Sequence, residues 1–167
     1  MITLGIDPGT ATTGFGIIRE EEDGRLTALN FGVIQTASDL SQAERLVQLY
    51  KRINELILLH RPEMGAVEKL FFQRNVRTAL SVGQARGVAL LAMAELKLQI
   101  GEYTPLEVKQ AVVGYGGADK SQVQQMVKTI LGLEAIPHPD DAADALAVAI
   151  CHIHSAKIRN LYQENYE

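Results

Sequence analysis

Cysteine is almost absent from this sequence and long apolar runs are lacking, and each of these features excludes a class of protein. The single cysteine, Cys151, rules out an internal disulfide framework, is expected to be a buried thiol, and is typical of a reducing cytoplasm. No apolar run approaches the roughly 20 residues needed to span a bilayer, so no membrane association is expected. The N-terminus has no basic segment before its apolar stretch and does not resemble a secretory leader. We therefore expect a cytoplasmic protein.

Net positive charge is also lacking, and the formal charge of −4 at first argues against a nucleic-acid partner. Dividing the chain changes this interpretation. Residues 1–68 hold 6 basic and 10 acidic side chains, residues 69–128 hold 8 and 4, and residues 129–167 hold 2 and 6. A basic middle segment can meet a phosphate backbone even on an acidic protein. Solvated helix faces explain the same counts, so composition alone leaves both interpretations open.

The periodicity of the apolar positions predicts one α/β domain. Three strands with short connections, typical of an antiparallel meander, are expected at 1–7, 13–19 and 26–36. A helix follows, with a capping box of Ser41 and Glu44, and then a strand at 64–68, a long helix that Asn75 caps, and a strand at 98–103. Further helices are expected from Pro105, from Asp119, and from Asp140 to about residue 159.

This order of elements implies a mixed sheet covered by helices. A right-handed crossover would place the fourth strand parallel to the first and near it. We expect a single domain over residues 1–159 and a polar, frayed tail over residues 160–167.

Four acidic residues stand where strands end or a helix begins. Asp7 closes the first strand and Glu68 the fourth, so both are expected at the carboxyl edge of the sheet, where open α/β sheets bind ligands. Asp141 and Asp144 share one face at the start of the last helix. Taken singly, each acid has a structural explanation, such as a turn or a favourable helix dipole. Taken together, the four predict a catalytic site.

Carboxylates packed this closely repel one another unless cations lie between them. Hard oxygen ligands suit Mg²⁺, which keeps several waters and also binds substrate phosphate, and Mn²⁺ accepts the same ligands. Two such ions about 4 Å apart stabilise both oxygens of an in-line phosphoryl displacement. The acids therefore predict a site with two Mg²⁺ ions.

Five separated segments carry a family resemblance: GIDPGT at 5–10, VEKLFF at 67–72, GQARGVA at 83–89, VKQAVVGYGGADKSQVQ at 108–124 and DAADALAVA at 141–149. They resemble the RuvC family of Holliday-junction resolvases, in the same order and with similar spacing. The resemblance implies an RNase H-like fold, with a five-stranded mixed sheet flanked by helices. It also places the four catalytic and metal-binding acids of the family on Asp7, Glu68, Asp141 and Asp144.

The resemblance implies a structure-specific DNA endonuclease that acts as a homodimer on a four-way DNA junction. Each active site nicks one of two symmetry-related strands and leaves ligatable 5′-phosphate and 3′-hydroxyl ends. Members of the family work with the RuvA–RuvB branch-migration complex, which is therefore an expected partner.

Further positions receive roles from the same resemblance. Lys109 and Lys120 match lysines near the scissile phosphate, and Phe71 matches an aromatic residue that stacks on bases at the opened crossover. A helix bearing Gly83 and Gly87 belongs to the dimer interface of the family, although these glycines could equally serve packing within the chain. Three arginines of the basic segment are candidates for phosphate contacts, with solvated surface as the alternative: Arg74, Arg77 and Arg86.

Three other functions fit parts of the pattern. GIDPGT also resembles the first phosphate loop of sugar-kinase and actin-like ATPases, but those enzymes need two such lobes and 167 residues supply one. A general ribonuclease H would share the fold and the metals. A non-catalytic junction-binding module would keep the fold without cleaving. Because all four acids are present, we favour the nuclease.

Overall fold

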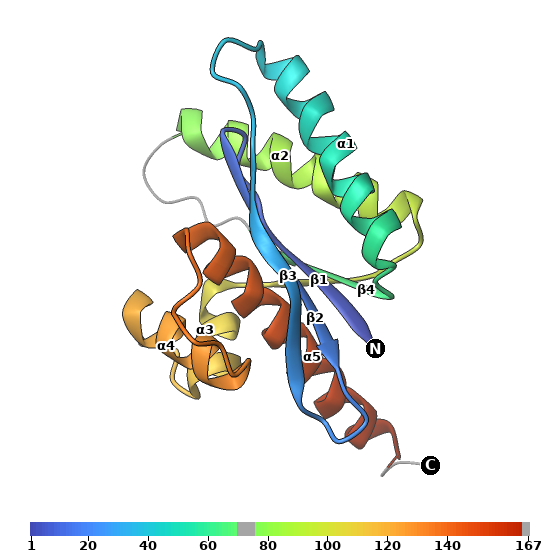
Figure 1. Cartoon of the computed structure of the whole chain (residues 1–167), viewed down its shortest axis with the longest axis vertical. Helices are drawn as coiled ribbons and strands as arrows, with labels where there is room; N and C mark the ends of the chain where they lie inside the picture. Colours follow the sequence, from blue (N-terminus) through green and yellow to red (C-terminus); the bar gives the residue numbers. More distant parts are fainter. Residues whose placement is uncertain (70–75, 165–167) are drawn as a thin grey trace.

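The computed structural model describes residues 1–69 and 76–164, and in residues 76–77 and 158–164 the backbone alone. Its centre is a five-stranded sheet in the order β3-β2-β1-β4-β5 (Figure 1). The strands are β1 (Ile2–Asp7), β2 (Thr12–Glu20), β3 (Leu26–Gln35), β4 (Met64–Glu68) and β5 (Gln99–Tyr103). The predicted strands are all present, with bounds that differ by a residue or so from those expected.

The pairing of the strands confirms the predicted mixed sheet. β1, β2 and β3 form an antiparallel meander, and β4 lies parallel to β1 on its other side, with β5 parallel to β4. The register sets Ile6 opposite Val67, so Asp7 and Glu68 follow as the next residues of two neighbouring parallel strands. Parallel strands end at the same edge, and both acids therefore lie at the carboxyl edge of the sheet.

Local sequence explains where the helices begin. Ser41 and Glu44 form the predicted capping box of α1, and Thr104 and Glu107 form another at α3, with Pro105 in its first turn. The helices are α1 (Gln42–His60), α2 (Val76–Glu95), α3 (Pro105–Val113), α4 (Lys120–Ile130) and α5 (Asp140–Glu164). α5 continues to Glu164, beyond the end expected near residue 159, so most of the expected tail is helical. The expected cap of α2, Asn75, lies outside the described residues.

The helices cover the two faces of the sheet unequally. α1 and α2 pack on one face, while α5 crosses the other face with α3 and α4 beside it (Figure 1). Successive strand residues point to opposite faces, so Val67 belongs to the core under α1 and α2 and Ala66 to the core under α5. No helix in the described part of the chain is long and apolar enough to cross a membrane. Cys151 is buried in α5, as predicted, and its burial raises the pKa of the thiol to about 11.

Candidate active site

Close contact between α5 and the sheet brings the four acids together. Gly14 of β2 is the register partner of Asp7. A Cβ atom at Gly14 would collide with the backbone carbonyl of Asp141, and one at Gly5 would collide with the backbone of Ala145. Because glycine has no side chain, the first turns of α5 rest directly on β1 and β2. Asp141 and Asp144, on that part of α5, are thus brought to the edge where Asp7 and Glu68 end their strands.

The four carboxyls are near enough to affect one another electrostatically. Burial raises the pKa of Asp7 from 3.8 to about 8. The negative charges of the other three carboxylates act in the same direction, in the order Asp144, Glu68 and Asp141, and only a neighbouring lysine opposes them. Asp7 is therefore a carboxyl that holds its proton through neutral pH unless a cation takes the place of that proton.

Two of the other acids are perturbed in the same direction. Burial, reinforced by the charge of Asp144, raises the pKa of Glu68, while Lys109 and Lys120 oppose the shift. Burial also raises the pKa of Asp144, against the pull of its hydrogen bond from Lys120. Desolvated acids that raise the pKa of one another, with cationic neighbours, are typical of functional sites.

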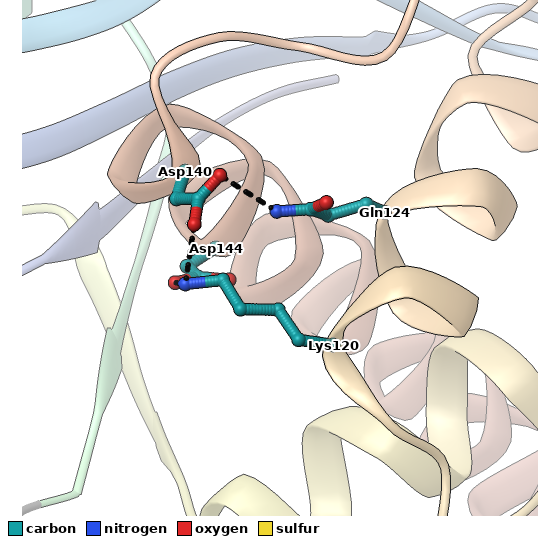
Figure 2. A network of polar contacts seen from close by, with 4 residues as sticks. All are labelled: Lys120, Gln124, Asp140 and Asp144. Atoms are coloured by element: carbon teal, nitrogen blue, oxygen red, sulfur yellow. Dashed lines mark hydrogen bonds and ion pairs between the residues drawn. The ribbon is translucent and has the colours of Figure 1, made fainter.

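Lys120, the first residue of α4, lies between two acids of α5 (Figure 2). Its Nζ is 3.2 Å from a carboxylate oxygen of Asp140 and 3.2 Å from one of Asp144. Gln124, one turn further along α4, donates to the other oxygen of Asp140 at 3.0 Å. Partial burial lowers the pKa of Lys120, but the two carboxylates outweigh it and the net shift is upward. The start of α4 is therefore tied to the start of α5 by a cation that borders the acids.

A cavity of about 200 Å³ opens beside these residues. Its charged lining consists of Glu68, Asp144, Lys109 and Lys120, and valine, alanine and proline side chains complete the wall. The lining offers carboxylate oxygens for a hard cation and two ammonium groups for a phosphate.

The donor set fits Mg²⁺ or Mn²⁺, because it consists of partly buried carboxylates that repel one another. In the described part of the chain, no three aspartate, glutamate, histidine or cysteine side chains are already grouped tightly enough to hold an ion. The acids are near enough to shift the pKa of one another without closing on a single point.

The remaining predicted residues either lie outside the described part of the chain or lie away from the acids. Phe71 and Arg74 lie outside the described residues, as does the side chain of Arg77. Gly83 and Gly87 lie on α2, away from the acids on the other face of the sheet. A Cβ atom at Gly87 would meet nothing within 4 Å, so this glycine is not needed for packing within the chain.

Arg86 is only partly exposed and forms contacts within the protein. Its side chain is only 20% exposed, forms an ion pair with Glu102, and donates from Nε to the backbone oxygen of Glu68 at 3.3 Å. Both acceptors belong to the protein, so the side chain is not simply solvated, and its predicted phosphate contact stays a prediction.

Several residues that shape the site were not predicted from the sequence. Asp140 pairs with Lys120 and Gln124 donates to Asp140, yet neither residue stands out in a motif. The sequence alone did not link Gly5 and Gly14 to α5. The glycines of β1 and β2, opposite a helix rich in alanine, were the available signal.

A five-stranded mixed sheet with helices on both faces and acids at its carboxyl edge defines an RNase H-like α/β protein. The sequence profile described as "Crossover junction endodeoxyribonuclease RuvC" matches residues 3–152, and the chain belongs to this family.

Individual relatives agree with this assignment. A crossover junction endodeoxyribonuclease RuvC of Syntrophomonas wolfei is 52% identical over 165 residues, which cover 99% of this chain and 95% of the relative. The structure of Thermus thermophilus RuvC is 38% identical with a TM-score of 0.88, covering 95% of this chain and 96% of that one. T. thermophilus RuvC in complex with a Holliday junction substrate is 35% identical with a TM-score of 0.86 over the same shares.

Proposed function

We propose that this protein is a metal-dependent endonuclease that resolves four-way DNA junctions by paired, symmetric nicks in two like strands. The observation that carries the proposal is the convergence of Asp7, Glu68, Asp141 and Asp144 at one edge of the sheet, with the pKa of Asp7 raised to about 8. Family membership supports the junction as substrate, because the related T. thermophilus protein is described in complex with a Holliday junction.

The four carboxylates would hold Mg²⁺ or Mn²⁺ in the proposed mechanism. Two bound ions would supply Lewis-acid stabilisation of the attacking water oxygen and of the leaving 3′ oxygen. Attack of water on phosphorus with cleavage of the P–O3′ bond leaves 5′-phosphate and 3′-hydroxyl ends. The protein supplies a desolvated pocket for these carboxylates. Burial and repulsion raise the free energy of the ionised acids, and this increases the gain when a cation arrives.

Cationic residues would orient the DNA backbone against this centre. Lys109 and Lys120 line the cavity beside Glu68 and Asp144, where an ammonium group can bind the phosphate next to the scissile bond. Phe71, Arg74 and Arg77 belong to the same proposal by family resemblance: the phenylalanine would stack on an opened base and the arginines would contact phosphates.

We also propose a homodimer, because two symmetric nicks require two active sites. α2 offers a suitable surface: Leu80 and Leu91 are exposed, and Gly87 between them leaves open space. These residues and Gly83 lie on a face where another helix can approach closely. Cooperation with RuvA–RuvB in the cytoplasm completes the proposal, on family membership alone.

Cleavage of a mobile four-way junction tests the proposal, with a linear duplex of the same sequence as the control substrate. We expect paired, ligatable nicks in the junction alone, lost with EDTA or in Asp7→Asn, while the variant still binds the junction. Asp39→Asn is the matched control, since it removes an exposed carboxylate and should cleave normally. Junction binding by the wild type without cleavage in Mg²⁺ or Mn²⁺ would refute the enzyme and favour a binding module.

A further inference from the structure

Arg86 contacts the carboxyl edge of the sheet from the face opposite to the acids. It lies in α2, and its guanidinium forms an ion pair with Glu102 of β5. Its Nε also donates to the backbone oxygen of Glu68 at 3.3 Å. The Arg86 side chain is 20% exposed and the Glu102 side chain 40%, so water screens this pair only in part.

The side chain and the backbone of Glu68 face different neighbours. Val67 points into the core under α1 and α2, so the alternation of the strand directs the Glu68 carboxylate to the α5 side. On that side the charge of Asp144 contributes to the raised pKa of Glu68. Arg86 approaches from the α2 side and holds the peptide group of the same residue. A change at Arg86 therefore reaches Glu68 without touching the other acids.

The end of β4 is also paired with β5, where Glu68 is the register partner of Tyr103. Glu68 is the last residue of the strand, and the backbone of Lys69 donates to the carbonyl of Tyr103 at 2.7 Å. Glu102, which precedes Tyr103 in β5, is the acid that pairs with Arg86. Arg86 thus connects the last residue of β4 to β5 through a side chain that α2 supports.

We propose that Arg86, oriented by Glu102, is a positioning residue for the Glu68 carboxylate. It acts on the backbone of Glu68 and so sets where this carboxylate stands relative to Asp7 and Asp144. The inference rests on the proposed function, in which Glu68 holds a metal ion. Residues that orient a metal ligand in this way commonly change metal affinity or activity about 10- to 100-fold when they are removed.

The Arg86→Gln variant tests this role, with Arg52→Gln as the matched control. Arg52 also forms an ion pair, with Glu55 on the exposed surface of α1. Mn²⁺ binding without DNA is measured by electron paramagnetic resonance, and junction affinity is measured in EDTA at several salt concentrations. We expect Arg86→Gln to bind Mn²⁺ about 10-fold more weakly and to need correspondingly more Mg²⁺ for half-maximal cleavage. Its junction affinity and salt dependence should equal those of the wild type and of Arg52→Gln.

Other outcomes overturn the inference. If Arg86 contacts phosphate instead, junction affinity falls, the slope of log affinity against log salt decreases by about one, and Mn²⁺ binding is unchanged. Equal Mn²⁺ binding in folded Arg86→Gln and wild type is also incompatible with positioning. A wild type that neither binds metal nor cleaves would instead refute the proposed function itself.

If Arg86→Gln does not fold, the Glu102→Gln variant tests whether Arg86 positions the Glu68 carboxylate. This variant keeps the Arg86 side chain and its donation to Glu68 but removes the charge that orients the guanidinium. We expect weaker Mn²⁺ binding in the same direction and of smaller size. A folded Glu102→Gln protein that binds Mn²⁺ as tightly as the wild type contradicts the inference.

Discussion

The two faces of the sheet bury different kinds of group. Under α1 and α2 the strands contribute large aliphatic side chains such as Leu4, Ile6 and Ile17 to the core. Under α5 the strands contribute Gly5 and Gly14, and the backbone of the helix rests on them. On the face under α1 and α2, burial of apolar side chains stabilises the fold. On the face under α5, the glycines make fewer side-chain contacts, but they allow the helix to lie closer to the strands.

The close approach of α5 to the strands brings carboxylates into a desolvated site, which raises the free energy of their ionised forms. The face under α1 and α2 has no such group of acids among the described residues. Asp7, Glu68 and Asp144 all have raised pKa values, each with burial as the largest cause. The only buried polar or charged residues among those described are Thr3, Thr13 and His152, so ionised groups are confined to the edge of the core. Both faces thus contribute buried apolar residues to the fold, and the α5 face also holds the desolvated acids of the candidate cation site. Four substitutions test this difference.

Gly14→Ala should damage the α5 face most. The added Cβ would overlap the backbone of Asp141, which cannot rotate away as a side chain can, so α5 must shift. We expect cleavage to fall about 100-fold, because a displacement of about 1 Å at a catalytic site has this effect. The free energy of unfolding should fall by about 1–3 kcal/mol. Junction cleavage rates and chemical denaturation measure the two effects.

Gly32→Ala in β3 is the control for that substitution. Its Cβ would meet only the ring of Phe15, a side chain that can move. Cleavage close to the wild-type rate is expected for this control. If Gly14→Ala cleaves equally well, close approach of α5 is not what assembles the acids.

Asp7→Asn should stabilise the protein in EDTA. Between pH 3.8 and about 8 the folded protein keeps a proton on Asp7 that the unfolded chain has released. The unfolded state then binds fewer protons, so the free energy of unfolding of the wild type falls as pH rises through this window. Asparagine has no proton to lose, and at pH 8 the variant should be more stable by an amount on the order of a few kcal/mol.

Urea denaturation at pH 5 and pH 8, in EDTA, measures this difference. Addition of Mg²⁺ at pH 8 should restore stability to the wild type and not to Asp7→Asn, because the cation replaces the proton. The opposite result would be a wild type whose free energy of unfolding rises between pH 5 and pH 8 and a variant that is no more stable than the wild type at pH 8. It would mean that the Asp7 carboxyl is not desolvated.

The sequence predicted the fold closely because its local signals agree with the tertiary structure. The capping boxes at Ser41 and Thr104 and the turn after Asp7 mark element ends by their own hydrogen bonds and dihedral angles. The four acids were predictable for a related reason. Each stands at the end of a strand or the start of a helix, and topology then decides which of these ends meet.

Contacts between distant segments explain what the sequence did not predict. Arg86 has a basic side chain in a basic segment, and only the position of Glu102 on β5 reveals that its charge is used within the protein. Gln124 and Asp140 likewise meet only because α4 packs against α5. An isolated sequence reports the chemistry of such side chains without the neighbours that decide their roles.

Lys120→Gln should weaken junction binding without unfolding the protein. The lysine is half-exposed and its ion pairs to Asp140 and Asp144 are screened by water, so they add little to stability. If Lys120 binds a phosphate, the slope of log affinity against log salt should decrease by about 0.9. Lys128→Gln, at the other end of α4, should leave the slope unchanged. Equal slopes in Lys120→Gln and wild type would remove this lysine from the DNA contacts.

Leu91→Gln, on the face covered by α1 and α2, should have the smallest effect of the four substitutions, and only on formation of the dimer. Leu91 on α2 is 59% exposed, so the free energy of unfolding of a single chain should change by no more than about 0.5 kcal/mol. If α2 packs against a second copy, burying a polar side chain there raises the dissociation constant of the dimer, by about 10-fold for about 1.4 kcal/mol. Leu106→Gln is the matched control, 64% exposed on α3 of the opposite face. Sedimentation equilibrium measures the dissociation constants. If both variants and the wild type give the same value, the dimer contact lies elsewhere than on α2. The two faces of the sheet would then differ only in their part in catalysis.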